Sequence, residues 1–252
     1  MFRNIPPITK NIIILNVLMY LAANFLFSGY LYKILPAFYP FSPNFHSWQI
    51  VTHMFMHAQF YGGVGLTHIL FNMFTLWSFG PVLEQVLGEK KFLLLYFLSG
   101  LGAFVLFNIW NFYEISQITN QLHAIGVDVS EIFRMSDLNY EGEARIDTKT
   151  DEGLVLSKEL FASLQTPMLG ASGAIFGVVA AFSTLFPNAK LMFLFIPYPI
   201  KAKYILPFVI VVSLYLGFSD KMPGIAHFAH IGGAITGFLI AWTWRKNHPQ
   251  IY

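Results

Sequence analysis

The chain has 252 residues, of which 56% are hydrophobic and only 11% are charged. Soluble domains carry roughly a quarter charged residues, so this composition excludes an ordinary soluble protein and predicts a polytopic membrane protein. The net charge is +2 and there is no cysteine, which excludes disulfides, thiol catalysis and thiolate metal sites.

Apolar stretches that could cross, or nearly cross, a bilayer predict an all-α membrane protein with six transmembrane helices. They lie at 12–27, 66–86, 92–112, 169–186, 205–218 and 225–244. The first stretch follows Arg3 and Lys10 and ends without a small-residue cleavage pattern, so we expect it to remain as an anchor. The fourth and fifth stretches are shorter than the roughly 20 residues needed to cross alone. We therefore expect a water-filled depression beside them.

Basic residues predict how the helices are oriented. Many of them lie near the termini or in the even-numbered loops, namely Arg3, Lys10, Lys90, Lys91, Lys190, Lys201, Lys203, Arg245 and Lys246. Loops rich in lysine and arginine stay on the cytoplasmic side. Both termini are therefore expected in the cytoplasm, with the loops at 28–65 and 113–168 and the short loop at 219–224 outside. We expect an integral multi-pass protein of a bacterial inner membrane.

The loop at 113–168 is acidic and is the one segment with a soluble composition. We interpret the chain as a single membrane domain, 1–252, with this loop as a partly helical extracytoplasmic insertion between the third and fourth helices. Apolar residues recur at helical spacing from Ile115 to Ile132, which predicts that the third helix continues past the membrane. A polar turn at 139–152 and a short helix at about 154–164 should follow. A solvated linker and a functional lid both fit this composition.

Polar residues of catalytic type occur in the opening turns of the second, fourth and sixth predicted helices. They are His68 and Asn72, then Ser172, then His230. Polar groups are costly inside a membrane and usually mark a functional site. These three helices all start from the outer face, so at about 1.5 Å of rise per residue their polar groups lie at a similar shallow depth. We expect them to meet in one site.

Two pairs of glycines predict close packing of the fourth and sixth helices. Gly173 and Gly177 form one small surface, and Gly233 and Gly237 form another one turn below the histidine of the sixth helix. Small residues spaced by four let membrane helices approach almost backbone to backbone. Such contact would bring the serine hydroxyl within the roughly 3 Å of the imidazole that proton transfer requires.

The chemistry that these residues allow is nucleophilic catalysis. Ser172 needs a base to remove its proton, and His230 fits that role, so the chain offers a serine–histidine dyad. Asp220 is interpreted as a solvated turn residue rather than a third member. His68 and Asn72 lie four apart on one helical face and carry N–H donors for an oxyanion. The N-terminus of the fourth helix adds backbone donors near the serine.

At these positions the chain resembles the rhomboid family of intramembrane serine proteases, over nearly its whole length. The matching segments are Gly170-Ala171-Ser172-Gly173 with Gly177, His68-Ile69-Leu70-Phe71-Asn72, and Ala229-His230-Ile231-Gly232-Gly233 with Gly237. The resemblance implies a six-helix bundle that cleaves transmembrane protein substrates in the bilayer.

The resemblance also implies roles for individual residues. Ser172 would be the nucleophile and His230 the general base and acid. His68, Asn72 and the Ser172 amide would stabilise the oxyanion, and Phe176 would pack on the catalytic imidazole.

Further positions match the family less closely. Glu84 resembles the acidic residue that braces the first outer loop, and His227 resembles a polar residue at the mouth of the site. Members often carry Trp-Arg in the first outer loop, whereas here Trp48 is followed by Gln49. How that loop is braced is therefore left open.

Two other classes of function remain as alternatives. Histidines at spacings that can bind zinc or haem suggest a metal-binding membrane protein, namely His53, His57, His68, His227 and His230. The His-Glu-x-x-His signature is missing and no carboxylate accompanies these pairs, so we expect no metal and no cofactor. His53 and His57 should instead form hydrogen bonds within the first outer loop. A catalytically inactive relative that binds membrane helices is disfavoured by the intact serine and histidine. The expected partners are transmembrane substrates and lipid, with no nucleic acid.

Overall fold

The computed structural model describes residues 5–27, 29–60, 63–143, 150–193, 196–219 and 226–247. It is mostly helical, as predicted, and a long helix lies at each of the six apolar stretches. These helices are α1 (Pro7–Leu21, continued by the π-helical turn η2, Ala22–Leu26), α4 (Val64–Leu87), α5 (Glu89–Ala124), α8 (Ser172–Leu185), α9 (Ile205–Ser219) and α10 (His227–Asn247).

Several of these helices are suited to a membrane. Within the described ranges, Pro7–Leu26, Gly65–Leu87 and Glu89–Ala124 are long and apolar enough to cross one, while Ser172–Leu185 and Ala202–Phe218 are apolar but shorter. Large apolar side chains also cover the outside of the bundle, among them Phe71, Phe74, Phe208 and Val211. So much exposed apolar surface is typical of contact with lipid. That all six helices cross the membrane stays a prediction.

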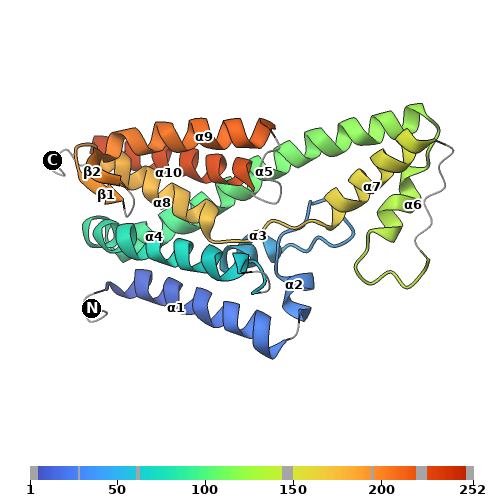
Figure 1. Ribbon diagram of the computed structural model, residues 1–252. Coiled ribbons are helices and arrows are strands. Elements are labelled where there is room, and N and C mark those ends of the chain that lie inside the picture. The colour runs from blue at the N-terminus through green and yellow to red at the C-terminus, as the bar shows by residue number, and fades with distance from the viewer. Residues whose placement is uncertain are drawn as a thin grey trace.

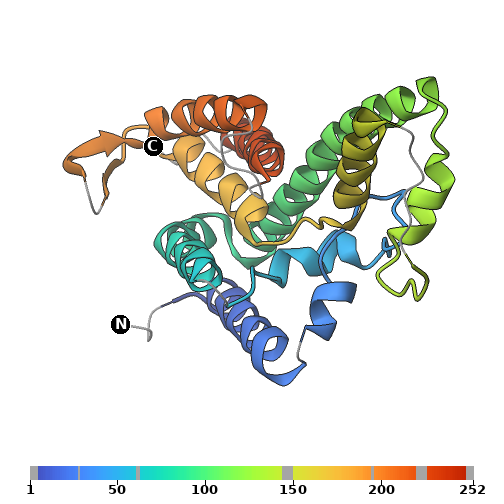
Figure 2. The same cartoon turned by 45° about the vertical axis from the view of Figure 1, so that its right-hand side comes forward.

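The helices are arranged around α8 and α10, which lie side by side with α5 against both of them. Helix α1 packs on α4, and α9 packs on α10 (Figures 1 and 2). The main apolar core lies among α1, α4, α5 and α8, with Leu76, Leu83, Phe92, Leu95 and Tyr96 fully buried. This packing places the N-terminal turns of α8 and α10 next to each other.

Glycines set the distance between these central helices. A β-carbon on Gly233 would lie 1.9 Å from the carbonyl oxygen of Gly173, and one on Gly237 would lie 2.1 Å from that of Gly177. The predicted glycine contact between the fourth and sixth helices is therefore confirmed. Helix α5 joins the contact through Ser99, whose hydroxyl would be 2.0 Å from a β-carbon on Gly177. The glycine spacing did not predict the contribution of this third helix.

Helix α1 begins at Pro7, before the predicted stretch, because a carboxylate of α4 binds its N-terminus. Glu84 is 3% exposed and accepts hydrogen bonds from the amides of Ile8 at 2.8 Å and Thr9 at 2.7 Å, and from the Thr9 hydroxyl at 2.7 Å. A negative charge is favourable where helix amides are unpaired. The expectation that Glu84 braces the first outer loop is thus wrong. It lies at the opposite end of α4 from His68.

The insertion is a small helical unit beside the bundle (Figure 1). Helix α5 extends far beyond the predicted span, as expected, but it ends at Ala124 instead of continuing to Ile132. Gly126, at φ 74°, turns the chain, and the amide of Val127 bonds to the carbonyl of Leu122 at 3.0 Å. A left-handed glycine with this hydrogen bond is a common way to end a helix.

Two helices complete the insertion. They are α6 (Val129–Met135) and α7 (Asp151–Gln165), and the latter confirms the short helix predicted at about 154–164. The Thr150 hydroxyl accepts from the amide of Gly153 at 3.1 Å and caps α7. A second apolar core, separate from that of the bundle, joins residues of the insertion to Tyr39 of the first loop. Its members are Tyr39, Ile115, Ile118, Leu122, Ile132, Leu160 and Leu164.

The remaining elements are short. The first loop contains α2 (Tyr30–Ile34), α3 (Gln49–Thr52) and the 3₁₀ turn η3 (His53–Phe55). Between α8 and α9, β1 (Lys190–Phe193) pairs antiparallel with β2 (Ile196–Lys201), followed by the 3₁₀ turn η4 (Ala202–Tyr204). This hairpin was not predicted and is a small departure from an all-α fold.

Candidate active site

A serine and a histidine from different helices form a hydrogen bond at the head of the bundle. Nε2 of His230 lies 3.0 Å from Oγ of Ser172. Ser172 is the first residue of α8, and His230 lies in the opening turn of α10. The separation is short enough for direct proton transfer. The two residues are 58 positions apart in sequence, so it is the packing of α8 on α10 that joins them.

Aromatic side chains surround the imidazole. The rings of Phe176 and His230 are stacked, with centroids 4.2 Å apart and planes at 12°. This places Phe176 where the resemblance implied. His227, the first residue of α10, is buried, and its ring lies edge-on to that of His230 at 6.3 Å. Stacking restricts rotation of the imidazole and so holds Nε2 toward the serine.

Gly170 allows a second histidine to approach the serine. A β-carbon at Gly170 would lie 3.1 Å from Nε2 of His68 and 3.4 Å from Oγ of Ser172, so both groups flank this glycine. Its φ of 125° also favours glycine. The amide of Gly170 donates to the carbonyl of His53 at 3.0 Å, which fixes the segment that enters α8. The three helices predicted to share a site therefore meet here.

Hydrogen bonds at His68 define where its proton lies. The amide of Ala58 donates to Nδ1 of His68 at 3.4 Å, so in the neutral ring the proton is on Nε2, the atom beside Gly170. Asn72 is 6% exposed, and its Nδ2 donates to the carbonyl of His68 at 2.9 Å. One of its two amide hydrogens is thus used within α4, and Asn72 forms no hydrogen bond with Ser172.

The two histidines of the first loop differ from each other. His53 Nδ1 bonds to the carbonyl of Gln49 at 2.8 Å, and burial lowers the pKa of His53 to about 4. His57 packs edge-on to His68 at 5.1 Å, and its ring nitrogens have no hydrogen-bond partner in the described structure. Burial, followed by the neighbouring His68, lowers the pKa of His57 to about 3. The predicted loop hydrogen bonding is confirmed for His53 and stays a prediction for His57.

The side chain of Gln49 braces the first loop. It is fully buried, and its Oε1 accepts from the amides of Phe38 at 3.3 Å and His46 at 3.1 Å. Its Nε2 donates to the carbonyls of Asn44 at 3.0 Å and Ile34 at 3.3 Å. One neutral side chain thus pairs four backbone groups of the loop. Sequence reasoning missed this role, although the departure from Trp-Arg marked the position.

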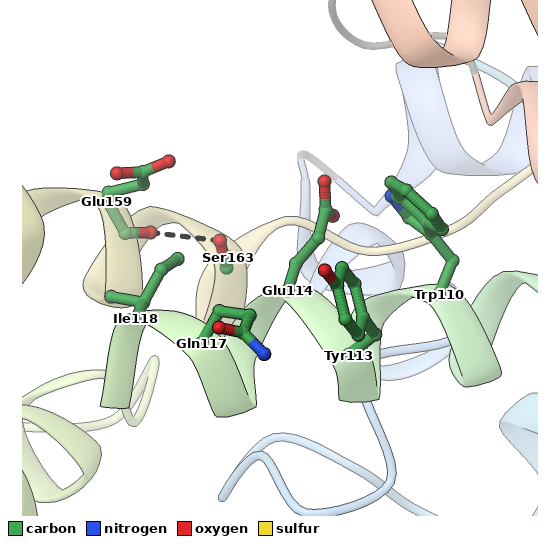
Figure 3. A pocket seen from close by; sticks show the side chains of 7 residues that line it. All are labelled: Trp110, Tyr113, Glu114, Gln117, Ile118, Glu159 and Ser163. Atoms are coloured by element: carbon green, nitrogen blue, oxygen red, sulfur yellow. Dashed lines mark hydrogen bonds between the residues drawn. The ribbon is translucent and has the colours of Figure 1, made fainter. Parts of the chain in front are cut away.

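A separate cleft lies between α5 and α7, away from the serine and the histidine. It has a volume of about 270 Å³ and is lined by Trp110, Tyr113, Glu114, Gln117, Ile118, Glu159 and Ser163 (Figure 3). Trp110 links it to the bundle by stacking on Phe228 of α10 at 4.1 Å. Among the residues that the structure describes, no three histidines or carboxylates are grouped to hold a metal ion. Asp220, and with it the part of the predicted loop at 220–224, lies outside the described residues.

Fold and site together define a helical integral membrane protein with a serine–histidine pair at the head of its central helices. The Rhomboid domain family matches residues 44–119 and 153–247. The chain belongs to the rhomboid family. The stretch between these two segments, 120–152, contains α6 and is not covered by the match.

Relatives come from mitochondria and from bacteria. The chain is 28% identical over 193 residues to Rhomboid protein 1, mitochondrial, of Saccharomyces cerevisiae, covering 77% of this chain and 40% of the relative. It is 28% identical over 197 residues to Rhomboid protease AarA of Providencia stuartii, covering 77% and 54%. It is 23% identical over 194 residues to Rhomboid protease GluP of Bacillus subtilis, covering 77% and 25%.

The chain spans about half or less of the length of these relatives. Two of these three relatives are named as proteases, which supports a hydrolase function for the family. The relatives include both mitochondrial and bacterial proteins. Membership of the family therefore supports a location in a membrane, but it does not support the bacterial inner membrane over the mitochondrial one.

Proposed function

We propose that the chain is an intramembrane serine endopeptidase that uses Ser172 and His230 as a catalytic dyad. The observation that carries this proposal is the 3.0 Å separation of His230 Nε2 and Ser172 Oγ. Membership of a family that includes named proteases supports it. No metal or cofactor is needed, because a hydroxyl activated by an imidazole can cleave a peptide bond through an acyl-enzyme.

The reaction begins with proton transfer from Ser172 Oγ to His230 Nε2 as the oxygen attacks the peptide carbonyl. The tetrahedral intermediate then collapses, the carbon–nitrogen bond breaks, and His230 returns the proton to the leaving amine. Water then enters and gives a proton to the same nitrogen as it attacks the acyl ester. The bond between the carbonyl carbon and Oγ breaks, His230 returns the proton to Oγ, and the second product leaves. Stacking on Phe176 keeps the imidazole in place through both halves.

The oxyanion would be met by His68 and by backbone amides. The Nε2–H of His68 faces the site because Ala58 occupies Nδ1. The amides at the N-terminus of α8, including that of Ser172, are unpaired by the helix and add a positive dipole end. Asn72 has one amide hydrogen left after bonding to the His68 carbonyl. We assign it to the oxyanion as well, after a small rotation of its side chain.

The substrates would be transmembrane segments of other membrane proteins. A stable helix hides its carbonyls in internal hydrogen bonds, so the scissile segment must unwind before it reaches Ser172. Segments with glycine or proline near the cut should be preferred. We propose that residues 1–252 form one membrane domain whose insertion at 113–168 and active site lie on the extracytoplasmic side, with both termini cytoplasmic.

The test is cleavage of a model transmembrane substrate by the purified protein in proteoliposomes. Ser172→Ala and His230→Ala should each abolish turnover. Ser183→Ala is the matched control, because this serine lies on the same helix, is buried, and its hydroxyl has no hydrogen-bond partner in the described structure. Full activity in Ser172→Ala would overturn the proposal. Binding of the substrate without cleavage by the wild type would favour the inactive membrane-helix-binding alternative.

A further inference from the structure

Hydrogen bonds attach the first loop to the insertion. Asn44 is 5% exposed and uses both ends of its amide: Nδ2 donates to the carbonyl of Ser136 at 2.8 Å, and Oδ1 accepts from the amide of Leu138 at 2.9 Å. Ser42 Oγ donates to the carbonyl of Leu164 at 2.8 Å. A buried polar group that loses its hydrogen-bond partner destabilises the fold. These buried bonds therefore indicate that the first loop and the insertion stay in contact, and they argue against an insertion that opens as a lid.

The same two segments share an apolar core. Tyr39 belongs to the first loop, yet it is 4% exposed and packs with Leu122, Leu160 and Leu164 of the insertion. An insertion that swung away from the loop would expose this aromatic side chain and the residues around it to water. The loop and the insertion are therefore one packed unit.

This unit holds the segment that leads into Ser172. Helix α7 ends at Gln165, and the chain then runs along the first loop before α8 begins. Met168 and Ala37 exchange two backbone hydrogen bonds of 2.8 Å, and the amide of Gly170 donates to the carbonyl of His53 at 3.0 Å. The approach to the serine is thus tied to the loop on both sides of residue 169.

We propose that the insertion acts as a brace for the active site, with Asn44 as the positioning residue that joins them. Asn44 holds the first loop on the turn at Ser136 and Leu138 that follows α6, while Ser42 holds it on Leu164 of α7. Through the first loop, Asn44 fixes the segment 166–171 and with it the direction of Ser172 Oγ toward His230. This inference rests on the proposed protease function. It assigns the insertion to positioning the site, whereas a lid or a substrate-selecting surface would act on the substrate.

The test compares Asn44→Ala with the matched control Asn139→Ala. Asn139 is an exposed asparagine of the insertion that bonds to Asp137 within its own turn. Hydrogen exchange is measured at the three amides that join the loop and the serine segment, those of Ala37, Met168 and Gly170. We expect exchange there to rise roughly tenfold or more in Asn44→Ala, since bonds of a loosened segment open more often, and to stay unchanged in the control.

Kinetics provide the second readout. In Asn44→Ala, kcat and the rate of phosphonate labelling of Ser172 should fall together by roughly tenfold or more, with KM within about twofold, because the defect lies in the site and not in substrate binding. Unchanged exchange at the three amides would overturn the brace. So would a raised KM with normal labelling, which would make the insertion a substrate-binding surface.

Two features keep this test separate from the proposed function. If the wild type neither cleaves nor labels, the protease proposal fails, while the exchange measurement still decides whether Asn44 braces the serine segment. If Asn44→Ala does not fold, Ser42→Ala is the second variant. It removes the hydroxyl that donates to the Leu164 carbonyl and accepts from the amide and Nδ2 of Asn44, but it keeps the bonds of Asn44 to Ser136 and Leu138, so it should produce smaller changes in the same direction. A Ser42→Ala protein with wild-type exchange and kcat would then count against the brace.

Discussion

Replacing Gly233 by alanine should separate the two helices that carry the dyad. The added β-carbon would lie 1.9 Å from the carbonyl oxygen of Gly173, and its other close contacts are also backbone atoms of Gly173. A carbon and a carbonyl oxygen normally approach to about 3.3 Å, so α10 must move away by roughly 1 Å or more. Since no side chain can rotate to relieve this overlap, we expect a loss of about 3 kcal/mol in stability, the upper part of the usual range for overpacking.

The same movement should also impair catalysis. Gly173 follows Ser172 directly, so a shift of about 1 Å would lengthen the 3.0 Å contact with His230 to roughly 4 Å, beyond hydrogen-bond reach. Misplacement by about 1 Å can cost on the order of 100-fold in rate. Denaturant unfolding in micelles measures the stability, and substrate cleavage measures kcat. Ile235→Ala, at an exposed position of α10, is the control. Wild-type kcat and stability in Gly233→Ala would refute the reasoning.

Three further predictions concern other residues. Glu84→Gln should lower the free energy of unfolding by about 2–3 kcal/mol, since hydrogen bonds to a charged group are lost. A double-mutant cycle with Thr9→Val measures the coupling energy between Glu84 and Thr9, and additive effects of the two substitutions would contradict this prediction. Asn72→Ala should lower kcat roughly 10- to 1,000-fold, as for loss of an oxyanion donor, and wild-type kcat would remove Asn72 from the oxyanion site. Burial lowers the pKa of His53 to about 4 and that of His57 to about 3. As the pH falls below ~6.5, these two imidazoles therefore take up protons in the unfolded chain before they do so in the folded protein. The free energy of unfolding should then decrease by up to about 1.4 kcal/mol per pH unit for each imidazole. Unfolding curves for His53→Gln should show a shallower pH slope than the wild type, and parallel slopes would contradict this.

Much of the helical framework could be predicted from the sequence, because burial in lipid leaves a direct mark on composition and periodicity. The meeting of Ser172 and His230 could also be predicted, since both lie at the start of helices that enter from one face. The glycines at 173 and 233 then required those helices to touch. The predictions of the helices and of this contact succeeded because each depends on a pattern of residues within single helices, and the sequence shows such patterns directly.

The contacts that failed prediction join segments far apart in sequence. Glu84 was matched to a loop, yet its carboxylate caps α1 across 75 positions. Gln49 looked like the loss of a bracing arginine, whereas its amide pairs four backbone groups whose positions only the folded loop defines. The apolar spacing of the third helix continued past the point where Gly126 turns the chain. Spacing records which side chains are buried, and it does not record a change of direction between them.

The central claim is that His230 activates the hydroxyl of Ser172, and covalent labelling tests it most directly. The purified protein is treated with a fluorophosphonate and the modified residue is located by peptide mass spectrometry. The account predicts one adduct, on Ser172 Oγ, and its loss in His230→Ala. An adduct on a different serine, no adduct on the folded wild type, or equal labelling without His230 would contradict it.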